Sequence, residues 1–420
     1  MNKFYLKSMG CKSNQFEGQI VAEKLVKAGF IGVNDIKRLE EGDFYILNSC
    51  SVTHKSDNEA MYLLRHAHSL GLKTILTGCI AQIEKSKLLK EEFIDFVYGN
   101  EDKFKIDEYL ESDKNYAVKD LMVANEFCPV VLNDTTKTRI SLKIQDGCDN
   151  RCSYCIIPFG RGKSRSASPD FIINEINRYT ENGYKEVVFT GIHIGLWGKE
   201  WGDSILSLLK RIEKETTIPR YRLGSLNPHE ITPELLNFLQ TSEKFCPHFH
   251  LSLQSACNST LKRMNRHYTV EYYLDQIEDI VSRFNNPFLG SDIIAGFAGE
   301  TEDDFETTVE NLLKSKLSKI HVFPYSVRKG TTAERMSGHL PDSVKEERAD
   351  IIKKISADKF NQFVKQNIGT TQEVLIEKRP DKHTGKFKGV TRNYLNVLLE
   401  SGEFNTIQSV VLTKDNILTV

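Results

Sequence analysis

Residues 148–155 read Cys-Asp-Asn-Arg-Cys-Ser-Tyr-Cys, three cysteines spaced C-x3-C-x2-C, and Ile-Ile-Pro-Phe-Gly-Arg-Gly follows them. Three closely spaced thiolates can hold three irons of a cubane cluster and leave the fourth iron without a protein ligand. That open iron can bind the amino and carboxylate groups of S-adenosylmethionine, so that an electron from the cluster can break a carbon–sulfur bond. The spacing of Cys148, Cys152 and Cys155 therefore predicts a radical-generating iron–sulfur site.

Other cysteine sites have different surroundings. Two-cluster ferredoxins place a fourth cysteine and a proline close behind the first three. A structural zinc site needs a fourth Cys or His nearby, and the first such residue after Cys155 is His193. The spacing favours an iron–sulfur cluster, and zinc or a chance grouping remains the alternative.

Composition limits the class of protein. The 420 residues are enough for two or three domains with a substantial core. The net charge of −1 means that any nucleic-acid contact must come from a local basic patch. No apolar run reaches about 18 residues, and the N-terminus lacks the apolar core of a signal peptide. We therefore expect a cytoplasmic protein without a membrane span, whose nine cysteines serve metal or redox chemistry rather than disulfides.

The first hundred residues repeat one pattern three times. Each unit is a short strand that runs to a cysteine and is followed by a helix, with strands at 4–6, 44–47 and 74–76. This alternation predicts a parallel sheet with right-handed crossovers, in which the loops after the strands share one ligand-binding edge. We therefore expect Cys11, Cys50 and Cys79 to converge as a second three-thiolate site. The alternative is three unrelated buried cysteines.

A second series of strands and helices begins near residue 140. Six strands are expected, at 140–144, 186–190, 221–226, 248–253, 290–295 and 319–323. Six units are too few for a closed eight-stranded barrel, so the pattern predicts a partial (β/α)6 barrel with an open side. A long charged helix at 341–366 would pack back on it.

The resulting fold class is α/β, with three domains. We expect an N-terminal parallel-sheet domain at 1–115, a connector at 116–135, the barrel domain at 136–366 and a small all-β module at 367–420. The last is predicted from short alternating strands at 373–376, 387–391, 396–399, 410–412 and 417–420.

The all-β tail carries an uneven charge. Between Lys365 and Arg392 there are seven Lys or Arg and three acidic residues, with Phe387 and Tyr394 inside or beside the run. Small β-barrels with basic and aromatic positions commonly bind RNA. The tail therefore favours an RNA contact, and a solvated hairpin is the alternative.

Candidate cofactor contacts lie in the cluster loop and after successive barrel strands. Tyr154 would lie against an adenine, and Arg161 or Arg165 would pair with the cofactor carboxylate. The other candidates offer backbone carbonyls, hydroxyls, amides or close approach at a glycine: Gly191, His193, Ser225, Gln254 and Gly296. Each alone has an ordinary structural interpretation, such as loop packing or a satisfied core histidine. The remaining cysteines do not share the strand-end position and are interpreted as bystanders: Cys128, Cys246 and Cys257.

Taken together, these motifs resemble those of the methylthiotransferase branch of the radical S-adenosylmethionine (SAM) enzymes over nearly the whole chain. The matching phrases are Met9–Asn14, Asn48–Val52, Gly78–Gln82, the cluster loop through Gly162, Leu253–Ser255, Lys262–Arg266, Asp292–Glu300 and His321–Ser326. Three phrases most resemble the enzymes that act on N6-threonylcarbamoyladenosine at tRNA position 37: Lys143–Cys148, Thr190–Gly195 and His321–Ser326.

The resemblance implies two 4Fe-4S clusters and S-adenosylmethionine. The loop cysteines would hold the radical cluster, and Cys11, Cys50 and Cys79 would hold an auxiliary one. It also implies a C-terminal TRAM-type RNA-binding module, the tRNA anticodon stem-loop as partner, a low-potential electron donor such as flavodoxin or ferredoxin, and a sulfur donor.

The expected reaction is addition of a methylthio group to C2 of N6-threonylcarbamoyladenosine. The C2–H bond is strong and unpolarised, so acid–base chemistry cannot activate it and a radical route is plausible. Alternatives from the same chemistry are methylthiolation of isopentenyladenosine in tRNA or of a ribosomal-protein aspartate. A non-catalytic, zinc-containing RNA-binding protein is the alternative from another class.

Overall fold

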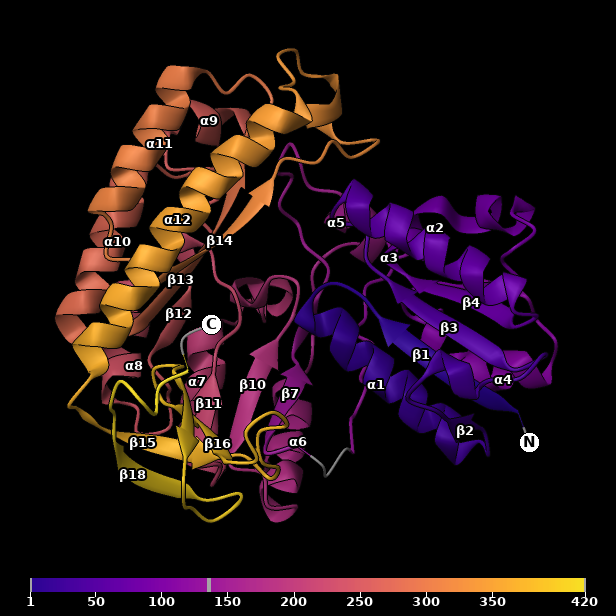
Figure 1. Ribbon diagram of the computed structural model, residues 1–420, viewed down its shortest axis with the longest axis horizontal. Coiled ribbons are helices and arrows are strands. Elements are labelled where there is room, and N and C mark those ends of the chain that lie inside the picture. The colour runs from indigo at the N-terminus through magenta and orange to yellow at the C-terminus, as the bar shows by residue number, and fades with distance from the viewer. Residues whose placement is uncertain (1, 134–136, 419–420) are drawn as a thin grey trace.

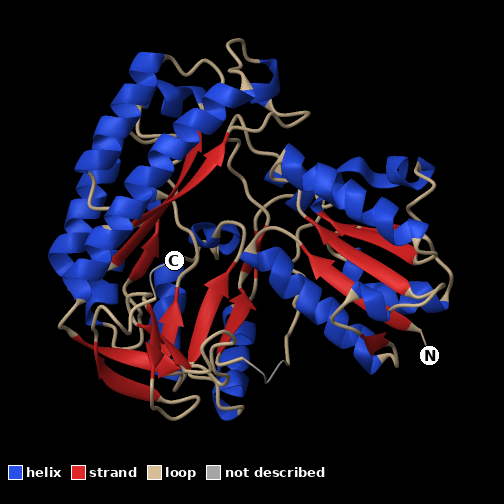
Figure 2. Cartoon of the chain, viewed as in Figure 1, coloured by secondary structure: helices blue, strands red, loops and turns tan. Residues whose placement is uncertain are grey.

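The computed structural model describes residues 2–133 and 137–418, which form three parts in chain order (Figure 1). Residues 134–135 of the expected connector and 419–420 of the last expected strand lie outside the described residues. Figure 2 shows a helix-flanked sheet on one side, a curved set of strands with helices outside it on the other, and a small all-strand part below. The predicted fold class is confirmed.

The N-terminal part is a six-stranded parallel sheet in the order β2-β1-β3-β4-β5-β6. Its strands are β1 (Lys3–Ser8), β2 (Ile31–Gly32), β3 (Phe44–Ser49), β4 (Lys73–Gly78), β5 (Phe96–Tyr98) and β6 (Tyr116–Ala117). Its helices are α1 (Lys12–Lys27), α2 (His54–Ser69), α3 (Cys79–Glu84) and α4 (Ile106–Glu111). The sheet thus takes up two residues of the expected connector.

Alternating side chains of β3 supply two hydrophobic cores, because successive residues of a strand face opposite sides. Phe44 and Ile46 pack with Phe16 of α1 in a core that continues into the barrel. Tyr45 and Leu47 lie in a second core with α2 and α3. Both faces of the sheet are therefore covered, which suits the fully buried pattern of β3.

The central part is a partial barrel of six parallel strands. They form two three-stranded sheets, β11-β10-β7 and β12-β13-β14, and isolated bridges at Tyr221–Phe245 and Leu226–Leu251 join the halves. The strands are β7 (Arg139–Lys143), β10 (Glu186–Thr190), β11 (Arg220–Arg222), β12 (His248–His250), β13 (Phe288–Ala295) and β14 (Lys319–Pro324). β11 and β12 are shorter than the expected strands 221–226 and 248–253.

Helices cover the outside of the barrel. They are α6 (Pro169–Glu181), α7 (Ile205–Glu215), α8 (Pro233–Thr241), α9 (Asn258–Arg263), α10 (Val270–Arg283) and α11 (Glu302–Lys314). Five of them begin at a Ser or Thr whose hydroxyl accepts a backbone N–H, which satisfies one of the free donors of the first turn: Ser168, Ser204, Thr232, Thr269 and Thr301. The long helix α12 (Asp342–Asn367) packs across β13 and β14.

The C-terminal part is an antiparallel sheet in the order β17-β16-β15-β18. Its strands are β15 (Thr371–Ile376), β16 (Phe387–Thr391), β17 (Asn396–Leu399) and β18 (Ile407–Val411). Its core includes Val374 and Val397, and it is shared with Phe363 of α12 and Phe288 of β13. The tail is therefore packed against the barrel, below the starts of β10 and β11 (Figure 1).

Two further strand expectations change at the end of the chain. The strand expected at 410–412 starts earlier, as β18. Of the strand expected at 417–420, the described residues show only a bridge from Ile417 to Val397. Within residues 2–133 and 137–418, no helix is long and apolar enough to cross a membrane.

Candidate active site

The three loop cysteines lie between β8 (Gln145–Asp146) and the short helix α5 (Ile157–Arg161). The loop is tied down by hydrogen bonds from the Cys148 N–H to Gly162 O at 3.1 Å and from the Ser153 N–H to Met264 O at 3.0 Å. Burial raises the pKa of Cys155 to about 12, and the charges of Cys152 and Cys148 add to the rise. The three thiols are thus close enough to influence one another.

Two polar side chains contact this trio. His193 Nδ1 lies 3.5 Å from Cys148 Sγ, and Arg266 Nη1 lies 3.3 Å from Cys152 Sγ. The other ring nitrogen of His193 contacts Glu230. Burial alone would lower the pKa of His193, but its hydrogen bonds to Cys148 and Glu230 raise it to about 9. The trio of Cys148, Cys152 and Cys155 therefore has two cationic neighbours.

The structure brings the three strand-end cysteines together at the carboxyl edge of the N-terminal sheet. Cys11 follows β1, Cys50 directly follows β3 and Cys79 begins α3. Burial raises the pKa of Cys50 to about 12, and nearby Cys79 and Cys11 contribute to the rise. Gly10 has a φ of +80°, and a Cβ placed there would lie 2.4 Å from Cys50 Sγ. This position therefore needs glycine both for its backbone conformation and for the thiol beside it.

The donor chemistry of both trios fits three-cysteine clusters. Within the described part of the chain, no three His, Cys, Asp or Glu side chains close around a single metal ion. A cubane cluster does not need that closure, because each thiolate binds a different iron. Each trio also has one member on a cavity: Cys11 lines one of about 670 Å³, and Cys155 lines one of about 250 Å³. A fourth, non-protein ligand would have room at either trio.

One short helix links the two trios. α5 starts two residues after Cys155 and ends at Arg161. Its Gly160 carbonyl accepts a hydrogen bond of 2.6 Å from Asn100 Nδ2, which also lies 3.9 Å from Cys79 Sγ. A Cβ at Gly160 would lie only 3.6 Å from Cys79 Cβ. The α5 backbone therefore packs directly on Cys79, one of the strand-end cysteines.

Behind α5 lies a buried ionic cluster that joins the N-terminal part of the chain to the barrel. The Glu17 carboxylate of α1 lies 2.5 Å from Lys103 Nζ, 2.6 Å from Lys143 Nζ and 2.5 Å from Arg161 Nη1. Asp146 lies 2.6 Å from Lys143 Nζ. Burial opposes ionisation of Glu17, but the three cations hold the pKa of its carboxyl well below its usual range. For Lys103, burial outweighs the attraction of Glu17, so its pKa is lowered.

Arg161 and Arg165 make their contacts in and beside this cluster. The expected partner of Arg161 was a cofactor carboxylate, whereas the structure places its fully buried guanidinium on Glu17. Arg165 donates to the carbonyls of Arg161 and Lys163 at 3.1 and 2.8 Å. Neither guanidinium lines either of the two cavities beside the trios.

The larger cavity lies between the edge of the N-terminal sheet, the barrel interior and the tail. The predicted residues Gly191 and Ser225 line it together with Cys11. Its lining also includes His250, which lies 2.9 Å from Asp292 Oδ2. Cys11, one of the strand-end cysteines, thus opens directly on the space enclosed by the barrel.

The smaller cavity collects two other predicted residues, Tyr154 and Gln254, beside Cys155. The ring of Tyr154 packs edge-to-face on Phe297 with centroids 6.3 Å apart. The lining includes the hydroxyl of Tyr325, which is buried without a hydrogen-bond partner. An apolar space with an unpartnered donor at its wall suits an aromatic base with polar edges.

His193 and Gly296 lie apart from these cavities. His193 lies against Cys148, as described above. Gly296 packs against Lys345 of α12, where an added Cβ would lie 2.6 Å from Cγ, and its N–H donates to Glu300 Oε1 at 3.0 Å. The structure therefore distributes the predicted cofactor contacts over several places instead of one.

Sequence reasoning missed several polar side chains at the trios. Arg266 is part of the matching phrase Lys262–Arg266, but only its contact with Cys152 Sγ indicates a role at the site. Arg328 lines the smaller cavity and donates 2.8 Å to Ser51 Oγ, next to an auxiliary cysteine, while its Nε and Nη1 are buried without partners. A pattern search for arginines close behind strand ends could have found Arg328, which follows β14 by four residues.

Comparison with protein families gives two matches. The description "Radical SAM superfamily" fits residues 142–312, and "Uncharacterized protein family UPF0004" fits residues 3–99. The first range begins in β7 and ends in α11, and the second covers the part of the N-terminal sheet that holds the strand-end cysteines.

Curated proteins align over almost the whole chain. The threonylcarbamoyladenosine tRNA methylthiotransferase MtaB of Thermotoga maritima is 33% identical over 100% of this chain and 97% of its own length. The MtaB of Bacillus subtilis is 33% identical over 94% and 90%. A tRNA-2-methylthio-N(6)-dimethylallyladenosine synthase of Thermodesulfovibrio yellowstonii is also 33% identical, over 91% and 90%.

Solved structures share the fold at low identity. The radical S-adenosylmethionine methyltransferase TsrM from Kitasatospora setae superposes with a TM-score of 0.55 and 12% identity, over 77% of this chain and 75% of that one. The S-adenosylmethionine radical enzyme OxsB gives a TM-score of 0.50 and 13% identity over 84% and 56%. These likenesses concern the fold alone.

Proposed function

The chain belongs to the methylthiotransferase family of radical SAM enzymes, and we propose that it adds a methylthio group to C2 of N6-threonylcarbamoyladenosine in the tRNA anticodon loop. One observation carries the proposal: two separate three-cysteine sets lie at the two ends of one short helix, and Cys11 of one set lines a cavity inside the barrel. Full-length similarity to threonylcarbamoyladenosine enzymes supports this choice of substrate.

The enzyme uses two 4Fe-4S clusters and S-adenosylmethionine. We assign Cys148, Cys152 and Cys155 to the radical cluster, and the strand-end cysteines to the auxiliary one. When bound, these groups supply a radical strong enough to activate an unpolarised C–H bond and a sulfur atom to replace the hydrogen. Because only thiolates bind iron, the raised pKa values of the buried thiols mean that protons leave as the clusters are loaded.

Residues around Cys148, Cys152 and Cys155 would stabilise the negative charge of their thiolates. Arg266 donates to Cys152 Sγ, and it is itself fixed by the Ser252 carbonyl, to which it donates at 3.1 Å. His193 is held between Cys148 and Glu230. These contacts orient the thiols and stabilise negative charge on sulfur, as hydrogen bonds to metal-bound thiolates do.

The smaller cavity is our proposed site for the adenosyl part of S-adenosylmethionine. Tyr154 and Gln254 line it beside Cys155. The unpartnered hydroxyl of Tyr325 and the unpartnered nitrogens of Arg328 offer donors for polar groups of the ligand.

The larger cavity is our proposed site for the target base. A base inside a stacked loop cannot reach it, so the nucleotide must be turned out of the stack. The basic β tail packs below the barrel and would hold the surrounding RNA. We further propose that the enzyme works in the cytoplasm, with a flavodoxin or ferredoxin as electron donor and a separate sulfur donor.

Nucleoside mass spectrometry of tRNA from a deletion strain tests the reaction. The 2-methylthio form of N6-threonylcarbamoyladenosine should disappear while its unmethylthiolated precursor accumulates, and plasmid-borne enzyme should restore it. Unchanged methylthio-nucleosides would refute the proposal.

Iron and sulfide analysis of anaerobically purified protein tests the cluster assignment. Two clusters correspond to about eight irons per chain. Cys11→Ala and Cys148→Ala should each retain about four, while Cys128→Ala, outside both trios, should retain all. Zinc in place of iron would reject both the assignment and the reaction.

A second candidate substrate is isopentenyladenosine in tRNA. The dimethylallyladenosine enzyme aligned above has the same 33% identity as the threonylcarbamoyladenosine enzymes. In the deletion strain, loss of methylthio-isopentenyladenosine with retention of the threonylcarbamoyl form would favour this candidate.

A further inference from the structure

Resting on the proposed function, we infer that Lys12, aided by His248 and Tyr394, binds the carboxylate of the threonyl group on N6 of the substrate adenosine. These residues come from three parts of the chain: α1, the barrel strand β12 and the loop before β17. They form a subsite of the barrel cavity, which we call the carboxylate subsite.

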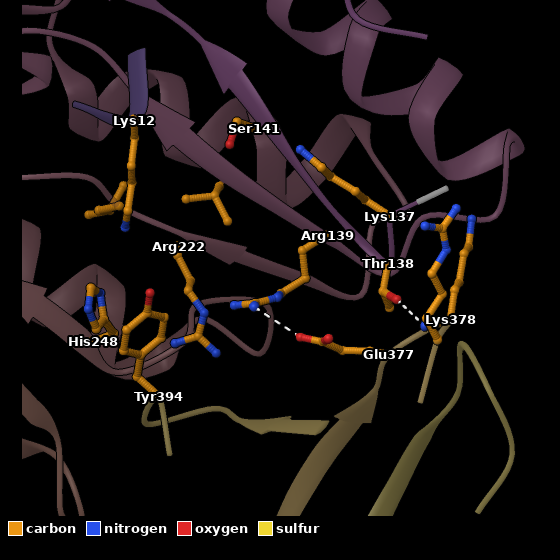
Figure 3. Close-up of a pocket in the computed structure, with 13 residues that line it drawn as sticks. Lys12, Lys137, Thr138, Arg139, Ser141, Arg222, His248, Glu377, Lys378 and Tyr394 are labelled. Carbon is orange, nitrogen blue, oxygen red and sulfur yellow. Dashed lines mark hydrogen bonds and ion pairs between the residues drawn. The ribbon is translucent and has the colours of Figure 1, made fainter. Parts of the chain in front are cut away.

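Lys12 is the first residue of α1 and directly follows Cys11. Its side chain lines both the cavity of about 670 Å³ and an adjoining one of about 450 Å³ near the tail. Figure 3 shows it reaching toward the space above His248 and Tyr394. Its ammonium lies 5.8 Å from the centroid of the Tyr394 ring, and among the described residues it has no carboxylate partner.

His248 is an independent sign that a ligand belongs here. The side chain is 7% exposed, and its Nδ1 is buried without a hydrogen-bond partner. The ring stacks on Phe288 with centroids 5.2 Å apart and lines both cavities. An unmade hydrogen bond at a buried nitrogen is costly, and a ligand oxygen in the cavity would remove that cost.

The electrostatic field at this point favours an anion. Burial would raise the pKa of Tyr394, yet Lys12, Arg139 and Arg222 together bring it below its ordinary value. Burial lowers the pKa of His248, and Arg222 and Lys12 lower it further. A phenol that is easier to ionise and an imidazole that is harder to protonate both report positive potential.

The charges lining the two cavities point the same way. Among the described residues, two carboxylates line them, and both have cationic or histidine partners: Asp292 with His250, and Glu377 with Arg139. Seven Lys or Arg side chains line the same walls: Lys12, Lys137, Arg139, Arg222, Lys319, Lys378 and Arg379. A carboxylate would gain charge-assisted hydrogen bonds from these cations, which a hydrocarbon substituent cannot form.

The chemistry of the substrate places its carboxylate near Lys12. Sulfur transfer requires C2 of the base to face the auxiliary cysteines, including Cys11. In adenine, C2 and the N6-bearing carbon both flank N1, so the N6 substituent leaves from the edge next to C2. The residue that follows Cys11 in the chain is therefore within reach of the substituent.

The oxyanion that Lys12 meets could instead be a backbone phosphate, and binding measurements separate the two sources. Holoenzyme would be titrated anaerobically with anticodon stem-loops that differ only at position 37, carrying N6-threonylcarbamoyladenosine, its methyl ester or adenosine. Loss of one charged hydrogen bond corresponds to about ten-fold or more in affinity. Wild-type enzyme should therefore bind the acid about ten-fold more tightly than the ester or adenosine.

Variants test which residues produce the preference for the acid loop. Lys12→Met should abolish it while leaving the affinity for the adenosine loop unchanged, and Lys12→Arg should retain most of it. His248→Phe, which keeps the stack and loses Nδ1, should reduce it. Lys27→Met, at the far end of α1 where it pairs with Glu23, is the matched control and should leave it intact.

Two results would overturn the inference: equal wild-type affinity for acid and ester, or equal weakening of all three loops by Lys12→Met, which would indicate a phosphate contact. Iron content checks that Lys12→Met keeps both clusters, and the acid-to-ester comparison on wild-type enzyme stands without that variant. Failure of the proposed function is separate, because it would appear as no methylthiolation of the acid loop by wild-type enzyme.

Discussion

Replacing Glu17 by glutamine should strongly destabilise the junction between the N-terminal sheet and the barrel. The carboxylate is fully buried and lies within 2.6 Å of Lys103, Lys143 and Arg161. Glu17→Gln preserves the shape but removes the carboxylate that Lys103, Lys143 and Arg161 share. Among the described residues, Asp146 then remains for Lys143 and Arg161 and no carboxylate pairs with Lys103, so the mutual repulsion of the three cations is only partly offset.

The expected cost follows from breaking a buried ion pair, about 3 to 5 kcal/mol. In a cooperative unit of roughly 150–250 residues this corresponds to a fall in Tm of about 6 to 20 °C. Glu23→Gln, on the same helix, removes a partly exposed pair with Lys27 and should cost about 0 to 1 kcal/mol. The contrast between the two variants, measured on one helix, isolates the effect of burial.

Thermal unfolding followed by circular dichroism, under anaerobic conditions and with equal iron content, measures the difference. A pH series adds a second readout. The folded-state pKa of Glu17 is depressed, so its stabilisation is present above the ordinary carboxyl pKa and is lost as the pH falls below it. Wild-type Tm should therefore decline more steeply in acid than that of Glu17→Gln. Equal Tm losses in Glu17→Gln and Glu23→Gln would refute this account of the cluster.

Three other changes give distinct readouts. Gly10→Ala should halve the iron content, because its Cβ would lie 2.4 Å from Cys50 Sγ. The control Gly29→Ala has a similar backbone conformation, with a φ of +91°, but open space around its Cβ, so it should retain the iron. Equal iron content in both variants would contradict the packing argument. Arg266→Gln removes a cation 3.3 Å from Cys152 Sγ and should lower the reduction potential of the radical cluster in an EPR-monitored titration; an unchanged potential would count against a role in charge stabilisation. Burial and a neighbouring lysine lower the pKa of Lys359 to about 8, so wild-type stability should rise with pH from about 8 toward the ordinary lysine pKa. Chemical denaturation across that range should give a flatter profile for Lys359→Met, and parallel profiles would refute the assignment.

Local sequence patterns were sufficient to predict the strand-to-helix repeats and the positions of the cysteines. Cys148, Cys152 and Cys155 lie in one loop, so their proximity is encoded in their spacing. Cys11 and Cys50 are 39 positions apart, yet both follow strands of one parallel sheet, and the geometry of such sheets brings strand ends to one edge. In both cases a short-range pattern or a general fold rule was enough.

Long-range partners could not be predicted in the same way. Arg161 lies close behind the cluster loop, which suggested a cofactor carboxylate, but its carboxylate is that of Glu17, 144 positions earlier. A guanidinium fits either partner equally well, and only the packing of α1 against the barrel decides between them. Lys12 raised no expectation, because a lysine at the start of a helix is ordinary until the tail and β12 enclose it.

The position of α5 between the trios also sets a distance that the enzyme cannot adjust. A helix rises about 1.5 Å per residue, so the five residues of α5 act as a spacer of roughly 8 Å with little freedom to stretch. Asn100 and Glu17 fix its far end to the N-terminal sheet. The separation between the two metal centres would thus be fixed by the length of this helix. Adding a residue to α5 should therefore disable turnover even if both clusters assemble.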